Sequence, residues 1–353
     1  MWYFKPKTPG DTIREPVQSE FFATDAISDP GVALVREGIQ NSLDAARPGE
    51  KVLVCIYLSG NGGALAPNAV SAYFEGAWDH LRAGENGLRA DELPCPTDRC
   101  SFIAFEDFGT RGLQGNPAEP FRSRTGRKNH FYHFFRAEGQ SDKDASQRGS
   151  WGVGKHVFPR SSRISTMFGV TVRADDRGRL LMGKTVLKSH YVGHDYCQDG
   201  YWGVPPGDGR ELVMPIAERG QIDTFCQAFD LQRGGDPGLS LVVPWPDPAM
   251  TDRSIVLAVL RGYFFPVLSG QLEVMVETPT VKTVLDAASL PGEVARIGDL
   301  GQDIDIQPLL RLVRLADWAR QLPPQEKASL EMPDPDRAWQ WSEELFQPDL
   351  LAA

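Results

Sequence analysis

The sequence contains no stretch of apolar residues long enough to cross a lipid bilayer, which argues against a transmembrane helix. Its first residues, MWYFKP, also lack the positively charged segment followed by an apolar one that marks a secretory signal peptide. The hydrophobic share of 41% is ordinary for a globular protein, and 353 residues can bury a sizeable core. We therefore expect a cytoplasmic protein of one or two domains with no membrane partner.

Paired cysteines are lacking as well. The chain has five cysteines, an odd number, which does not indicate a disulfide framework. Two groups hold metal-binding residue types, namely Cys95 with Cys100, and His190 with His194 and Cys197. Neither group has the paired short spacings of a zinc site, so we expect reduced thiols and ordinary histidines there.

Positive charge is also in deficit. A net charge of −10 argues against a surface devoted to nucleic acid, because such surfaces are usually basic. One local basic cluster is present at residues 122–128 (RSRTGRK), and it fits either a solvated loop or a basic groove. Contact with DNA therefore stays open, although the net charge does not support it.

What the sequence does have is a series of apolar segments typical of helices mixed with strands. Ser28 or Asp29 can cap a helix that begins at Pro30 and ends before Arg47-Pro-Gly. The other main elements expected are strands over 51–58 and 101–106, a short helix over 130–135, strands over 163–173, 180–191 and 239–243, a helix over 255–268, a strand over 271–277 and a helix over 308–321. A change of pattern predicts a boundary near residue 250.

Three segments carry residues suited to chemistry, and the first is the helix over 30–46. Glu37, Asn41 and Asp44 stand at positions i, i+4 and i+7, so they lie along one stripe of the helix. A carboxylate there can polarise a water molecule, and an amide oxygen can hold Mg²⁺, which prefers hard oxygen ligands. Taken alone, the stripe also fits a solvated polar face.

The second segment is Asp107-Phe-Gly109-Thr-Arg-Gly112, at the end of an apolar strand. Its two glycines permit positive φ angles and a close approach of the backbone to a ligand. An aspartate at a strand end can accept a hydrogen bond from an exocyclic amine, which is one way to recognise adenine. Taken alone, the segment also fits a tight turn.

The third segment is Gly149-Ser-Trp-Gly152-Val153-Gly154-Lys155. Closely spaced glycines expose successive backbone N–H groups to an anion, and a lysine supplies a point charge for a terminal phosphate. The segment therefore indicates phosphate binding.

A P-loop is the competing interpretation, since Gly149, Gly154 and Lys155 match most of its pattern. However, His156 stands where a P-loop needs the Ser or Thr hydroxyl that binds magnesium. The preceding residues, SDKDASQR, are also too polar to form the buried strand that a P-loop follows. The context disfavours a P-loop.

In their order and spacing the three segments resemble the Bergerat-fold GHKL superfamily of ATPases, with a motif style nearest to MORC and MutL proteins. The first looks like the N box of that family (Glu-xxx-Asn-xx-Asp-Ala), and the other two look like its glycine boxes. The resemblance implies an α+β fold, a two-layer α/β sandwich with a mixed, largely antiparallel sheet. That ATP-binding domain would span residues 20–250, followed over 251–353 by a smaller α/β region, transducer-like or partner-binding.

The resemblance also implies residue roles. Glu37 would be the general base, Asn41 the magnesium ligand, Asp44 a support for the site and Asp107 the residue that recognises adenine. Ser141 and Lys143 look like a Ser-x-Lys element of the lid over the nucleotide, and Lys282 is the one candidate for a lysine that reaches the terminal phosphate from the following domain. The remaining nucleotide contacts would come from Gly109, Gly112, Gly149, Gly152, Val153, Gly154, Lys155 and Ser240.

Two departures from the family pattern affect these roles. The first glycine box has one extra residue, so Gly112 is expected to be displaced. In the late strand Leu239 stands where the family usually has Thr, and Ser240 comes one position later. Because successive strand residues face opposite sides of a sheet, Ser240 need not point at the adenine.

We therefore expect a magnesium-dependent ATPase that hydrolyses ATP and acts as a conformational switch. The family resemblance suggests ATP-driven formation of a homodimer, or a complex with a protein partner subunit, in a DNA-related process or in bacterial antiviral defence. The alternative from another class is a nucleotide-binding interaction module with little turnover. The presence of Glu37 favours the enzyme, because pure binding needs no general base.

Overall fold

The computed structural model describes residues 1–11, 29–121, 128–137, 156–207, 209, 211–299 and 306–323. The chain divides into two compact units, Met1–Leu290 and Pro291–Ala353. The first unit contains every described strand and most of the described helices.

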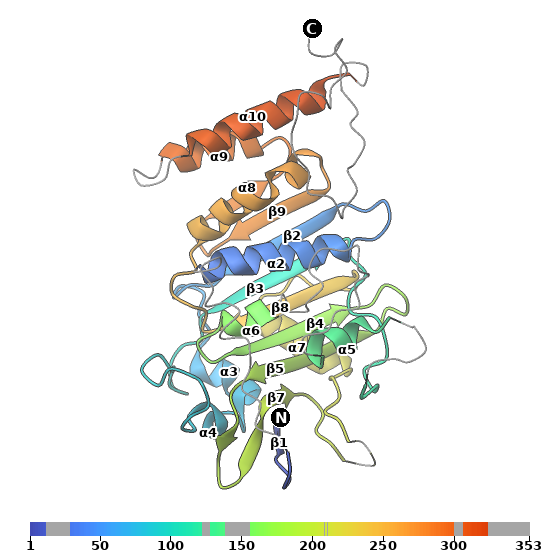
Figure 1. Ribbon diagram of the computed structural model, residues 1–353, viewed down its shortest axis with the longest axis vertical. Helices are drawn as coiled ribbons and strands as arrows, with labels where there is room; N and C mark the ends of the chain where they lie inside the picture. Colours follow the sequence, from blue (N-terminus) through green and yellow to red (C-terminus); the bar gives the residue numbers. More distant parts are fainter. Residues whose placement is uncertain are drawn as a thin grey trace. The chain divides into compact units, whose positions relative to one another are not determined.

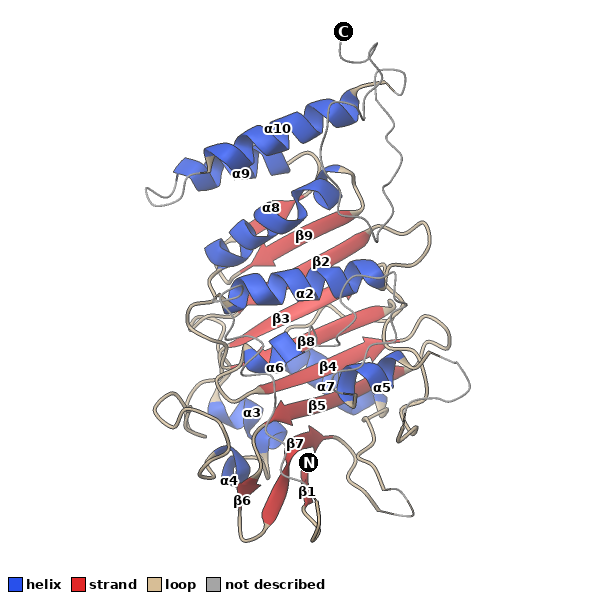
Figure 2. Cartoon of the chain, in the orientation of Figure 1, coloured by secondary structure: helices blue, strands red, loops and turns tan. Residues whose placement is uncertain are grey.

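The first unit is built on one open sheet of ten strands (Figures 1 and 2). The order is β1-β7-β5-β4-β8-β3-β2-β9-β10, with β6 paired to β7 off this path. The strands are β1 (Trp2–Pro6), β2 (Val52–Leu58), β3 (Phe102–Phe108), β4 (Thr166–Val172), β5 (Arg179–Val186), β6 (His190–Tyr191), β7 (Asp195–Trp202), β8 (Gly238–Pro244), β9 (Leu272–Glu277) and β10 (Lys282–Leu285). Only β2 and β9 pair in parallel among them, which confirms the predicted mixed, largely antiparallel sheet of an α+β protein.

Nine helices lie within the described residues, seven of them wholly in the first unit. These seven are α2 (Pro30–Asp44), α3 (Pro67–Phe74), α4 (Trp78–Leu81), α5 (His130–Phe135), α6 (Val157–Arg160), α7 (Arg219–Ala228) and α8 (Asp252–Leu268). None of the helices in the described ranges combines the length and apolar character needed to cross a bilayer.

Helices pack on both faces of the sheet, and β3 shows why. Phe102 of β3 contacts Phe229 at the end of α7, whereas Phe105, on the opposite side of the same strand, contacts Phe158 of α6. We call the side of α2 and α6 the front face, which faces the viewer in Figure 1, and the side of α7 the back face. Strand β4 is buried at every position, as expected for a strand covered on both sides. The structure thus adds a layer to the two-layer sandwich that we predicted.

Helix α2 begins where the sequence predicted. The Asp29 carboxylate accepts hydrogen bonds from the backbone N–H groups of Gly31 at 2.8 Å and Val32 at 3.2 Å, and Pro30 occupies the first helical position. Gly38 lies against the sheet, because a Cβ atom there would come within 2.8 Å of the Phe105 ring. The glycine therefore lets the helix approach β3 closely.

The sheet continues past the boundary predicted near residue 250. Strand β9 pairs in parallel with β2, from Val52↔Leu272 to Tyr57↔Glu277, and α8 packs beside α2. The first compact unit accordingly extends to Leu290. The sequence gives no sign of this parallel pairing between distant segments.

The second unit contains two helices in its described part, α9 (Leu290–Asp299), whose first residue belongs to the first unit, and α10 (Gln307–Gln321). The helix predicted over 308–321 is therefore confirmed. Helix α10 buries Val313 but leaves Leu312, Leu315 and Trp318 exposed.

Two histidines, the half-buried His80 and the buried His190, form a pair near strand β1. The imidazole of His80 stacks on the Phe4 ring, with 3.7 Å between ring centroids, and its Nδ1 lies 2.8 Å from Nε2 of His190. Nδ1 of His190 donates to the carbonyl of Lys188 at 2.9 Å, so Nε2 of His190 is the acceptor from His80. Burial, followed by the neighbouring His190, lowers the pKa of His80 to about 4, and burial also lowers the pKa of His190.

We predict that Gly38→Ala destabilises the protein by about 1–3 kcal/mol, because the added methyl group overlaps the Phe105 ring. The matched control is Gly262→Ala in α8, where nothing lies within 4 Å of an added Cβ. That control should stabilise the protein by about 0.5–1 kcal/mol through helix propensity alone. Urea denaturation measures both changes, and a stabilising Gly38→Ala would contradict the close packing of α2 on β3.

We also predict that stability falls as the pH drops from about 6.5 towards 4. In this range the unfolded histidines take up protons that the folded pair, with its lowered pKa values, does not. The melting temperature of His80→Gln should depend less steeply on pH than that of the wild type. The exposed His194 provides the control, since His194→Gln should keep the wild-type slope. An equal dependence of the melting temperature on pH in all three proteins would contradict this prediction.

Candidate functional site

The stripe predicted on α2 is present in the structure. Glu37, Asn41 and Asp44 are all half-buried and lie along one side of the helix. The Glu37 carboxylate pairs with Arg36 at 3.1 Å, and its side chain is 26% exposed, which leaves it within reach of water. Asp44 accepts a hydrogen bond from Gln40 one turn earlier, at 2.9 Å.

Asp107 is the point where α2 and the sheet are joined. Its carboxylate is 4% exposed and accepts three hydrogen bonds. Thr110 Oγ1 at 2.6 Å and the backbone N–H of Leu239 at 2.8 Å both donate to Oδ1, and the Ser42 hydroxyl of α2 lies 3.0 Å from Oδ2. A carboxylate offers about four acceptor positions, two on each oxygen. Among the described residues, Oδ2 accepts one hydrogen bond, from Ser42, and keeps its second position. One further donor, such as an exocyclic amine, can be accommodated there.

The turn after Asp107 is joined to the end of α2 through its backbone. The N–H of Arg47 donates to the Gly109 carbonyl at 2.9 Å, and the N–H of Arg111 donates to the Ala45 carbonyl at 3.0 Å. These bonds hold the second predicted segment directly against the first. The structure therefore brings together Asp44 and Asp107, which the sequence places far apart.

Gly109 and Gly112 are required by the packing of this turn. Both have positive φ, +77° and +66°. A Cβ atom on Gly109 would meet the Lys51 carbonyl oxygen at 2.2 Å, and one on Gly112 would meet the Val172 carbonyl oxygen at 2.3 Å. Protein backbone thus accounts for both glycines, and their contact with a nucleotide stays a prediction.

Arg111 belongs to this cluster, although no role was predicted for it from the sequence. Its guanidinium is half-buried and close enough to Asp44 and Asp107 for both charges to act on it. Burial lowers the pKa of Arg111, while the two carboxylates oppose that change. The sequence signal that could have pointed to Arg111 is the extra residue in the first glycine box, Asp107-Phe-Gly-Thr-Arg-Gly112. Ser42 and Thr110 were likewise missed, although both stand inside the motifs.

Ser240 and Lys282 do not join the front-face cluster. Ser240 is the strand partner of Glu106, not of Asp107, and its hydroxyl donates to Oε2 of Glu106 at 2.6 Å on the back face. Lys282 pairs with Glu277 at 3.5 Å, on the back face of β10 and β9. Both placements follow from strand alternation, which puts neighbouring residues on opposite faces.

The predicted phosphate-binding part of the site lies outside the described residues. This applies to Ser141 and Lys143 and to the whole second glycine box, Gly149, Gly152, Val153, Gly154 and Lys155. The basic cluster at 122–128 is likewise outside them except for Lys128.

The residues described on α2 suit magnesium only in part. No group of three or more His, Cys, Asp and Glu side chains that could hold a metal ion occurs in the described ranges. Magnesium at nucleotide sites is typically held by one or two protein oxygens together with phosphate oxygens and water. The half-buried amide of Asn41, in line with Glu37 and Asp44, provides an oxygen of the required kind.

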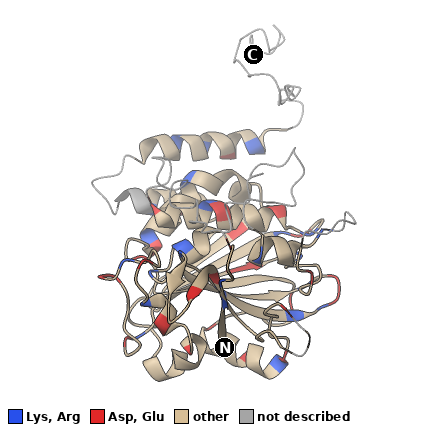
Figure 3. Ribbon diagram, turned by 60° about the horizontal axis from the view of Figure 1, so that its bottom comes forward, with Lys and Arg blue, Asp and Glu red and all other residues tan. Residues whose placement is uncertain are grey.

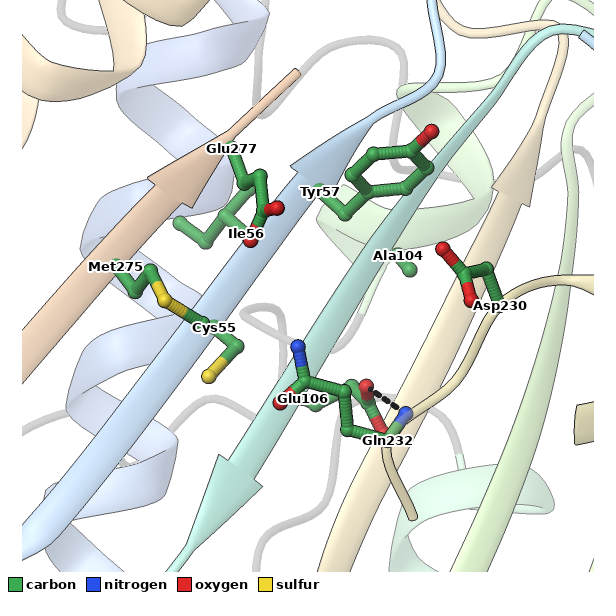
Figure 4. Close-up of a pocket in the computed structure, with 9 residues that line it drawn as sticks. All are labelled: Cys55, Ile56, Tyr57, Ala104, Glu106, Asp230, Gln232, Met275 and Glu277. Atoms are coloured by element: carbon green, nitrogen blue, oxygen red, sulfur yellow. Dashed lines mark hydrogen bonds between the residues drawn. The ribbon is translucent and has the colours of Figure 1, made fainter. Parts of the chain in front are cut away.

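A small hollow of about 60 Å³ opens on the back face, between β2, β3, β9 and the segment after α7 (Figure 4). It is lined by Cys55, Ile56, Tyr57, Ala104, Glu106, Asp230, Gln232, Met275 and Glu277. Small-molecule sites usually measure roughly 300–1,000 Å³, so the hollow is too small for a nucleotide. It is also separated from Asp107 by the sheet.

No protein-family model matches this sequence, and a search of curated proteins likewise finds no match.

We predict that Thr110→Val destabilises the protein by about 1–3 kcal/mol, because the buried carboxylate of Asp107 loses one of its donors. The separate variant Thr110→Ser should retain most of the wild-type stability, because it keeps the hydroxyl that donates to Asp107. The control Thr224→Val removes an exposed hydroxyl from α7 and should change stability by less than about 0.5 kcal/mol. Chemical denaturation measures all three, and equal effects of the two valine variants would contradict the role of Thr110.

Proposed function

We propose that this protein binds and hydrolyses ATP with magnesium, in a site of Bergerat type between α2 and the β3 turn. The observation that carries the proposal is the junction at Asp107. A buried carboxylate at a strand end is bonded to the helix that bears Glu37 and Asn41, and it keeps an acceptor position for an amine. The mixed, largely antiparallel sheet behind α2 supports the same family of folds.

In the proposed reaction a water molecule attacks the terminal phosphorus of ATP. The bond between that phosphorus and the bridging oxygen breaks, ADP leaves, and the proton of the water passes to the carboxylate of Glu37. Asn41 would hold Mg²⁺, which neutralises charge on the phosphate oxygens. The second glycine box would supply backbone N–H groups and the Lys155 charge to the same phosphates.

Adenine recognition would depend on Asp107 and its neighbours. The N6 amine of adenine is a donor and suits Oδ2 of Asp107, whereas guanine has a carbonyl oxygen at the equivalent position and would face the carboxylate with an acceptor. Arg111 offsets the negative charge of Asp44 and Asp107, so the base is not placed beside two uncompensated carboxylates.

ATP turnover would serve a conformational switch, with homodimer closure or binding of a partner subunit as its readout. In the view of Figure 3, the Lys and Arg residues of the described part of the chain are interspersed with Asp and Glu. Together with the net charge of −10, this favours a protein partner over DNA. A defence-related role belongs to the motif resemblance alone.

The second candidate, a nucleotide-binding module with little turnover, uses the same adenine contacts but needs no base. The Arg36–Glu37 pair favours it, because the carboxylate already has a neighbouring guanidinium as its partner at 3.1 Å. Rates and affinities separate the two candidates.

We predict that Glu37→Gln lowers the ATP turnover number by about 100-fold or more while leaving the dissociation constant for ATP within about threefold of the wild type. The matched control is Glu50→Gln, an exposed carboxylate paired with Arg47 at 3.7 Å beyond the end of α2, which should keep wild-type turnover. Steady-state phosphate release and calorimetric binding measure the two quantities.

The outcomes distinguish the candidates. Equal turnover in wild type and Glu37→Gln, with ATP still bound, would leave the binding module as the function. Absence of ATP binding to the wild type would overturn both. Sedimentation with and without a non-hydrolysable ATP analogue then tests the switch, for which a shift from monomer to dimer is expected.

A further inference from the structure

Strands β3 and β8 separate next to Asp107. Their pairing runs from Phe102↔Pro244 to Glu106↔Ser240 and stops there. One residue further, the N–H of Leu239 bonds to the side chain of Asp107, at 2.8 Å from Oδ1. The two strands therefore form a fork, and the carboxylate of Asp107 lies at its opening.

The guanidinium of Arg233 fills this fork. Arg233 is 3% exposed, and both sides of the fork accept hydrogen bonds from it. Its Nη2 donates to the carbonyls of Asp107 and, at 3.0 Å, of Leu239, while Nη1 lies 3.2 Å and 3.3 Å from the carbonyls of Asp236 and Pro237. The planar group also lies over the Phe108 ring, 4.2 Å from its centroid. Arg233 thus links the end of β3 to the start of β8 through several donors at once.

Two back-face residues complete the arrangement. Nε of Arg233 donates to the Ser240 hydroxyl at 2.9 Å, which in turn donates to Oε2 of Glu106 at 2.6 Å. The other oxygen of Glu106 accepts from the backbone N–H of Gln232 at 2.7 Å, the dashed contact in Figure 4. A buried carboxylate therefore stands near the buried cation, and Ser240 connects them.

We propose that Arg233 is the positioning residue that makes the site selective for adenine nucleotides. This inference rests on the proposed ATP site. By holding the Asp107 and Leu239 backbones together, Arg233 keeps the Leu239 N–H on Oδ1 of Asp107. The carboxylate is then fixed in one orientation, with Oδ2 directed to accept the exocyclic amine. Ser240 acts through Arg233 from the back face and does not contact the base.

The test uses Arg233→Lys in the full chain. An ammonium group on a flexible stem has three donors and cannot reproduce the planar fork of five that bridges both strands. We expect the dissociation constant for ATP to rise about tenfold or more, and the preference for ATP over GTP to fall by a similar factor. Turnover at saturating ATP should stay within about twofold of the wild type, because Glu37 and Asn41 lie on another element.

The matched control is Arg179→Lys. Arg179 is also largely buried, donating to Asp223 at 2.6 Å, but it lies on β5, which β4 separates from β8. Its substitution should lower the melting temperature and leave ATP affinity and base preference unchanged. If Arg233→Lys lowers only the melting temperature, as this control does, Arg233 is merely structural and the inference is overturned.

A second variant decides the matter if Arg233→Lys does not fold. Glu106→Gln keeps the size of the side chain but removes the charge that supports Arg233 from the back face, on the side of the sheet opposite the Asp107 carboxylate. We expect a smaller loss of base preference, about twofold to fivefold, in the same direction. Unchanged preference in this variant would overturn the inference while ATP binding by the wild type upholds the proposed site. A wild type that binds no ATP would overturn both.

Discussion

The buried carboxylate of Asp107 is the interaction on which the described half of the site depends. It is removed from water at the end of β3, and it is stabilised there by donors from three different places, the helix α2, the turn after β3 and the start of β8. A buried charge tolerates few arrangements, because each missing donor leaves part of it unsolvated. The position of α2 over the sheet, the shape of the glycine turn and the separation of β3 from β8 all follow from this requirement.

Much of this could be predicted from sequence because the relevant signals are local. Asp29 and Pro30 mark the start of α2, and the apolar run before Asp107 predicts β3. The stripe of Glu37, Asn41 and Asp44 follows from helix periodicity, and the alternation of strand residues already indicated that Ser240 need not face the base. In each case the residues that determine the feature lie within one element.

The parts that could not be predicted join elements distant in the chain. The residues next to Arg233 in the sequence do not predict that its guanidinium enters a fork between β3 and β8, because its partner Asp107 is 126 residues away. Arg111 gained its neighbours only through the docking of the turn on α2. The extra helical layer and the continuation of the sheet beyond residue 250 have the same origin, because they depend on which surfaces meet after folding.

The parallel pairing of β2 with β9 has a consequence for how the chain can be made and cut. Lys51 and Glu273 form an ion pair at 2.5 Å beside these strands, although they are 222 residues apart in the sequence. During synthesis β2 therefore cannot pair with β9 until most of the chain has been made. A protein truncated at the boundary suggested by the sequence would keep the pairing of β2 with β3 but leave β2, rich in Val and Ile, as an edge strand with its other side unpaired. Such edges recruit other strands and favour aggregation, so recombinant fragments should end beyond β10.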